Sequence, residues 1–105
     1  MTLKQIDKAV EFWKPLLKLE AWTIVVSVLP KSKMVHDGEE TEGHIVMHLE
    51  ERFANIELRR GASESTLVHE LLHIVHDGDT GIGEYNILHE RALNTVAEAM
   101  MFLKK

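Results

Sequence analysis

The stretch Ser63-Glu-Ser-Thr-Leu-Val-His-Glu-Leu-Leu-His-Ile-Val-His-Asp77 decides how the rest of the chain can be arranged. Ser63 is a favourable helix N-cap, Glu64 suits the first turn, and Gly78 favours a helix end directly after Asp77. With side chains placed about 100° apart, one side of this helix is apolar. Its apolar residues are Leu67, Val68, Leu71, Leu72, Ile74 and Val75. The stretch therefore predicts an amphipathic helix that packs its apolar back against a core.

The opposite side of the predicted helix carries polar residues that can act on one ligand. His69, His73 and His76 form a stripe there, with Glu70 beside them. Residues four apart lie one turn apart, so His69 and His73 can direct two imidazoles at one metal ion. Glu70 adjoins His69, and its carboxylate can reach a water bound to that ion. With zinc, such a water loses its proton readily and attacks a carbonyl, Glu70 acting as general base.

A catalytic zinc site needs a third protein ligand and an open position. Apolar residues recur at helical spacing near the end of the chain and predict a helix over about Tyr85–Leu103. Glu90 lies at the edge of the apolar side of this predicted helix. A half-buried carboxylate there needs a partner, and zinc would be one. The alternative is a boundary glutamate that pairs with Arg91 or Arg60.

Two histidines compete with Glu90 as third ligand. His89 lies nearer the centre of the apolar arc, which favours a core histidine over a ligand or a transition-state donor. His76 shares the stripe but lies one turn beyond His73, too far along the helix to complete one tetrahedron. Glu90 is therefore the predicted third ligand.

The remaining chain predicts an α+β fold in a single domain, residues 1–105, without repeats. Thr2 and Gln5 form a capping box for an N-terminal helix that Pro15 is expected to end or kink near Trp13. Polar residues 31–42 predict a mobile loop. Alternating or β-branched runs predict about three antiparallel strands, at 22–29, 44–49 and 53–59. The predicted order of elements along the chain is one helix, the sheet and then two further helices.

Composition narrows the class of protein. Apolar residues make up 45% of the chain and charged residues 28%, which is typical of a soluble globular domain. No apolar run approaches the roughly 18 residues of a membrane span, and the N-terminus does not resemble a secretory signal. A net charge of -5 without a basic stripe argues against nucleic acid as a partner. The absence of cysteine excludes thiolate ligands and fits the cytoplasm.

The segment Ser65-Thr-Leu-Val-His-Glu-Leu-Leu-His73, followed by a short loop and a helix that carries a glutamate, resembles the gluzincin branch of zincin metallopeptidases. It is most similar to the very small members, the minigluzincins and short phage-type metallopeptidases. The resemblance covers most of the chain. It implies a zinc-dependent peptidase, with endopeptidase activity expected, in which His69, His73 and Glu90 bind zinc and Glu70 is the general base.

The resemblance also implies a place for the substrate. Ala54-Asn-Ile-Glu-Leu58 is similar to the edge strand along which such enzymes hold an extended peptide. Tyr85 and His89 are near enough in sequence to be candidates for stabilising the transition state, and the alternative for Tyr85 is a packing aromatic at the start of a helix. Asp79 stands where another zincin branch has its third ligand, but His76 replaces the glycine which that branch requires.

Other classes fit less well. A peptide deformylase needs a cysteine ligand, and a three-histidine ribonuclease needs histidine at Asp79. The main alternative is a zinc-binding structural or regulatory module without peptidase activity. The glycine-rich segment Asp77–Gly83 is a candidate lid. His36, His44 and His48 are expected to be solvated and not to form a second metal site.

Overall fold

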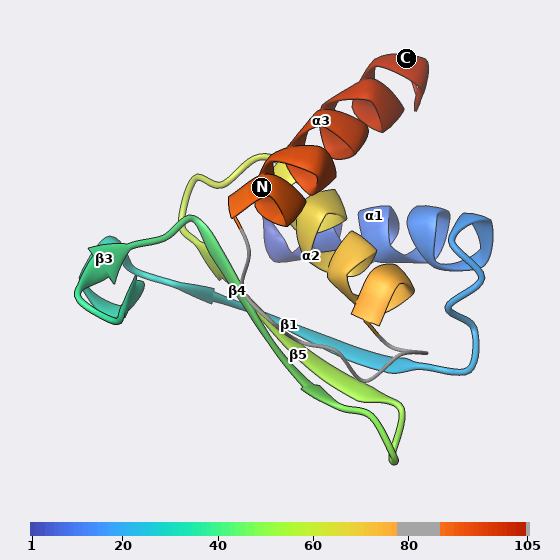
Figure 1. The fold of residues 1–105 in the computed structure, drawn as a ribbon, viewed down its shortest axis with the longest axis horizontal. Coiled ribbons are helices and arrows are strands. Elements are labelled where there is room, and N and C mark those ends of the chain that lie inside the picture. Colours follow the sequence, from blue (N-terminus) through green and yellow to red (C-terminus); the bar gives the residue numbers. More distant parts are fainter. Residues whose placement is uncertain (78–86, 105) are drawn as a thin grey trace.

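The structure is a computed structural model that describes residues 1–77 and 87–104, except the side chains of residues 87–89. Its elements are three α-helices, a three-stranded sheet and a separate two-stranded hairpin. The α+β prediction is confirmed. Helices cover one face of the main sheet and leave the other face open (Figure 1). The predicted loop at 77–83 and the start of the last helix at Tyr85 fall largely outside the described residues.

Helix α1 (Leu3–Leu16) begins with the predicted capping box. The backbone N–H of Gln5 donates to Thr2 Oγ1 over 3.1 Å, and the N–H of Thr2 donates to Gln5 Oε1 over 2.8 Å. The expectation that Pro15 ends this helix near Trp13 is wrong. Pro15 is accommodated in the last turn, and the helix ends at Leu16. Beyond the C-cap Leu17, Lys18 adopts a left-handed backbone (φ 58°).

The main sheet has the strand order β1-β5-β4, formed by β1 (Thr23–Leu29), β4 (Gly43–His48) and β5 (Phe53–Arg59). Strands β4 and β5 form an antiparallel hairpin, as predicted. Strand β1 instead runs parallel to β5, so the sheet is mixed and not wholly antiparallel. Strand β5 is therefore central, and the expectation that residues 54–58 form an edge strand is wrong. The edge strands are β1 and β4.

Residues 31–42 are structured, contrary to the expected loop. They form a short 3₁₀ helix η1 (Lys31–Lys33) and a hairpin of β2 (Val35–His36) and β3 (Glu39–Glu40). The turn is Asp37-Gly38, with φ of 53° and 82°. An Asp-Gly pair favours this left-handed turn in two-residue hairpins, so the sequence did carry a signal for it.

Strand alternation separates the two faces of the sheet. Ala54, Ile56 and Leu58 of β5 are completely buried and face the helices, while Asn55 and Glu57 face the open side. Helix α2 (Glu64–Asp77) packs its apolar back into this core, although Val75, predicted to join it, is exposed. Helix α3 (Ile87–Lys104) packs against α2 through Leu93 and Ala97.

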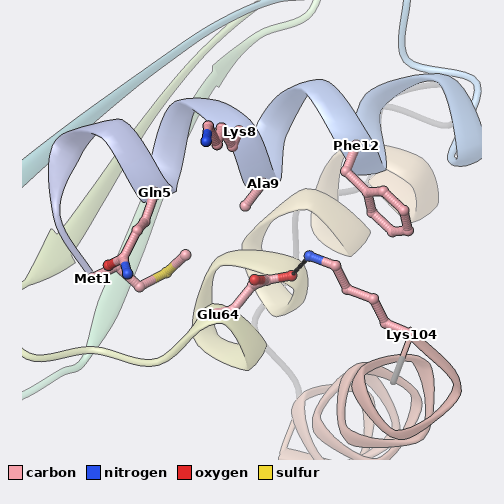
Figure 2. A pocket seen from close by; sticks show the side chains of 7 residues that line it. All are labelled: Met1, Gln5, Lys8, Ala9, Phe12, Glu64 and Lys104. Carbon is pink, nitrogen blue, oxygen red and sulfur yellow. Dashed lines mark hydrogen bonds and ion pairs between the residues drawn. The ribbon is translucent and has the colours of Figure 1, made fainter.

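Charged and aromatic side chains join the three helices at one end. Glu64, at the start of α2, accepts a hydrogen bond from Trp13 Nε1 over 2.7 Å and pairs with Lys104 at the end of α3. The Lys104 ammonium also lies 4.5 Å from the centre of the Phe12 ring. Figure 2 shows Phe12, Glu64 and Lys104 at an open pocket between α1 and the end of α3. This contact fixes the C-terminal end of α3, while Glu90 lies near its other end.

Candidate metal centre

Helix α2 places both histidines of the HExxH motif on the side that faces α3 and β4. His69 and Glu70 are 7% and 5% exposed, so the polar side of α2 is buried as well as the apolar side. One potential ligand atom from each of His69, Glu70 and His73 lies within 4.8 Å of the others. The predicted convergence of these three residues is confirmed, and the group could hold a metal ion.

Glu90 of α3 completes this cluster. Its Oε2 lies 2.7 Å from Nε2 of His69, and its Oε1 lies 2.9 Å from Nε2 of His73. Both imidazoles therefore present the same ring nitrogen to one carboxylate. The structure brings the predicted third residue to the site from a separate helix, with a half-buried side chain.

The residues fit a dication by their chemistry. Two buried imidazoles and two carboxylates meet in one place, and Glu70 Oε1 lies 3.9 Å from His69 Nε2. Burial, reinforced by the charge on Glu90, raises the pKa of Glu70 to about 8. Burial also lowers the pKa of His73; Glu90 opposes that shift, His69 adds to it, and Asp77 opposes it. A bound cation would offset the repulsion between the carboxylates, and neutral imidazole is the form that binds metals.

Asp77 is a site residue that the sequence analysis missed. It is 5% exposed, and its Oδ2 lies 3.5 Å from Nδ1 of His73. A carboxylate behind the second nitrogen of a metal-binding histidine orients the ring and makes it a better ligand. The signal was present, because Asp77 follows His73 by one helical turn. For His69, Nδ1 is buried and has no hydrogen-bond partner among the described residues.

Gly43 is the second residue that the sequence did not reveal. It begins β4 and faces α2, and a Cβ added there would lie 2.9 Å from Thr66 Cγ2 and 3.2 Å from Glu70 Cγ and Oε1. Only glycine lets the edge strand approach the helix this closely without displacement. Beside it, Glu42 accepts hydrogen bonds from Thr66 Oγ1 over 3.1 Å and from Arg59 over 3.2 Å. The start of β4 is thus held against the polar side of α2.

The other residues that the sequence suggested for the site lie outside the cluster or outside the described residues. His76 has a largely exposed side chain, and its Nδ1 contacts Asp77 Oδ1 at 2.7 Å, outside the cluster. Asp79, Tyr85 and the side chain of His89 lie outside the described residues, so their predicted roles stay predictions. His48 is exposed as expected, whereas His36 and His44 are partly buried.

Comparison of the chain with protein-family models, with curated proteins and with solved structures gave no match. Among the described residues, no helix is sufficiently long and apolar to cross a membrane.

Replacement of Asp77 by asparagine is expected to weaken metal binding by about 10–100-fold, because His73 loses the carboxylate behind its second nitrogen. Isothermal titration with zinc measures this change. His76→Gln is the matched control, since it alters the other imidazole that contacts Asp77 and is expected to leave the affinity unchanged. Equal affinities for Asp77→Asn and the wild type would show that Asp77 does not support the ligand.

Replacement of Gly43 by alanine is expected to lower the free energy of unfolding by about 1–3 kcal/mol through overpacking against Thr66 and Glu70. Urea unfolding measures this loss. In Gly43→Ala/Thr66→Ser the clashing methyl group is absent while the hydroxyl remains available to Glu42, so most of the stability should return. A double variant no more stable than Gly43→Ala would contradict the proposed contact with Thr66.

Proposed function

We propose that this protein is a zinc-dependent peptidase of the gluzincin type that hydrolyses peptide bonds as an endopeptidase. The observation that supports this most strongly is the meeting of His69 Nε2 and His73 Nε2 at the Glu90 carboxylate, with Glu70 next to them. Two histidines and one glutamate are a known ligand set for catalytic zinc. In this proposal His69, His73 and Glu90 hold the ion.

Zinc bound by these residues would supply a Lewis acid that polarises the substrate carbonyl and lowers the pKa of a water. Glu70 has the place of the general base, because its carboxylate adjoins the ligand cluster and lies 3.9 Å from a ligand nitrogen. It would accept a proton from the attacking water and deliver it to the leaving amine. His73 is kept in orientation by Asp77, and the buried surroundings limit access of bulk water to Glu70.

The substrate we propose is an extended peptide that lies beside β4. Among the described residues, strand β4 pairs with β5 alone in the main sheet, and Gly43 brings its start against Glu70. An edge strand can pair with an added strand through its free backbone groups. This assigns the peptide-binding strand to residues 43–48, in place of residues 54–58. The absence of cysteine fits action in the cytoplasm.

The alternative, a structural or regulatory zinc module, does not explain why Glu70 is buried beside the ligand residues. A carboxylate that is 5% exposed, with its pKa raised to about 8, is an unfavourable group to bury. Hydrolysis requires such a group beside the ion, whereas a structural site does not.

In Glu70→Gln we expect zinc binding to remain and peptide cleavage to fall by about 10²–10⁴-fold, because the amide cannot accept the proton. Cleavage of a mixed peptide library, followed by mass spectrometry, measures the activity of the zinc-loaded protein. Glu11→Gln, on the exposed surface of α1, is the control and should cleave like the wild type. Full activity in Glu70→Gln would contradict the mechanism, and a zinc-loaded wild type without activity would favour the module.

A further inference from the structure

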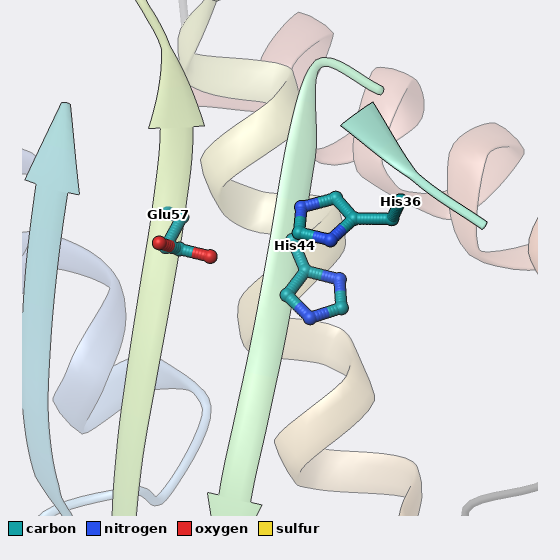
Figure 3. Close-up of side chains that lie close together, drawn as sticks. All are labelled: His36, His44 and Glu57. Carbon is teal, nitrogen blue, oxygen red and sulfur yellow. The ribbon is translucent and has the colours of Figure 1, made fainter. Parts of the chain in front are cut away.

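The open face of the sheet carries a second cluster of metal-binding side chains, away from α2. His44 of β4 stands directly opposite Glu57 of β5 in the antiparallel register. His36, from the β2–β3 hairpin, stacks on His44 with ring centres 3.8 Å apart and planes 12° from parallel. Figure 3 shows the three side chains, from three different strands, gathered in front of the sheet. One potential ligand atom from each lies within 4.8 Å of the others.

We propose that His36, His44 and Glu57 form a second metal site, which takes a divalent transition-metal ion of the zinc class. Two imidazoles and a carboxylate are the ligands that such ions accept in the absence of thiolates. The site uses none of the residues of the α2 cluster, so it stands whether or not the proposed peptidase function is correct.

Burial and an unpaired nitrogen support this assignment. All three residues are partly buried, and Nε2 of His36 is inaccessible to solvent without a hydrogen-bond partner among the described residues. A buried polar atom in this state carries an energetic cost that a ligand removes. The same crowding lowers the pKa of His44, through burial first and the neighbouring His36 second, while Glu57 and Asp37 raise it.

The local charges also favour a cation. The hairpin adds Asp37 and Glu39 next to His36, and Glu57 lies across from His44. The nearby Lys31 is directed to Glu40, which it contacts at 3.6 Å. The charged groups that act on His44 besides His36 are Glu57 and Asp37, and both are carboxylates.

Binding requires one small rearrangement. Two nearly parallel stacked rings cannot both direct a nitrogen at one ion, so one ring has to turn about its Cβ–Cγ bond. Rotation about this bond in histidine is broad and inexpensive. Turning the ring of His36 would leave the main sheet undisturbed, because His36 belongs to the separate β2–β3 hairpin. An ion held by all three side chains would fasten the hairpin to β4, the edge strand that begins beside Glu70.

The decisive experiment is a titration of the wild-type protein with zinc, followed by NMR of the histidine rings and by calorimetry. We expect two equivalents to bind, with the ring signals of His36 and His44 shifting together and separately from those of His69 and His73. His44→Gln should bind one equivalent fewer. The matched control is His48→Gln, which alters an exposed histidine on the same strand and the same face and should bind as the wild type does.

The outcomes separate this site from the one on α2. Shifts at His36 and His44 without shifts at His69 and His73 would support the second site and contradict the peptidase proposal. Rings of His36 and His44 that do not respond to excess zinc would overturn the second site. An equal loss of zinc in His44→Gln and His48→Gln would also overturn it. If His44→Gln does not fold, the wild-type ring signals decide the question alone.

Discussion

The contact between the Glu90 carboxylate and the two imidazoles of α2 links the candidate site to the fold. It requires α3 to lie along α2 with Leu93 and Ala97 buried between them, because all three residues occupy one side of α3. The far end of α3 is fixed independently through Lys104 and Glu64, at a distance of about 21 Å along the helix. The polar contacts of Glu90 and Lys104, with the buried residues Leu93 and Ala97 between them, thus hold α3 along α2. This packing sets the position of Glu90, the predicted third ligand.

Helix α2 consequently buries both of its sides. Its apolar back joins the core above β5, and its polar side lies under α3 and the start of β4. Buried polar groups destabilise a fold unless they find partners. Here His69 and His73 contact Glu90, and His73 also contacts Asp77. A bound ion would offset the free-energy cost of burying these groups.

Much of α2 was predictable because its determinants are local. The spacing of His69, Glu70 and His73 on an amphipathic helix is a property of consecutive residues, and so is the edge position of Glu90 on α3. Strand partners were less predictable. Alternation shows which face of β5 is buried, but it does not show that β1 pairs with β5 in parallel or that β5 is central.

The residues that were missed act through contacts between distant segments. Gly43 matters because β4 crosses close to Thr66 and Glu70, more than 20 positions later in the chain. His36 falls in the predicted loop 31–42 and His44 on the polar face of the predicted strand 44–49, so no local pattern predicted that they would be partly buried. Their stacking joins the β2–β3 hairpin to β4, which is a contact between separate sheets. Asp77 is different, since its spacing from His73 was visible and only its role was overlooked.

The most direct test of the α2 site is elemental analysis of zinc in the His36→Ala/His44→Ala protein, compared with the same protein carrying His69→Ala in addition. Of the two candidate metal clusters found in the described part of the chain, the first protein retains the one on α2. Our account therefore predicts about one zinc per chain there and almost none after the further substitution. Equal zinc contents in the two proteins, or no zinc in either after incubation with the metal, would contradict the assignment of His69, His73 and Glu90 as a metal centre.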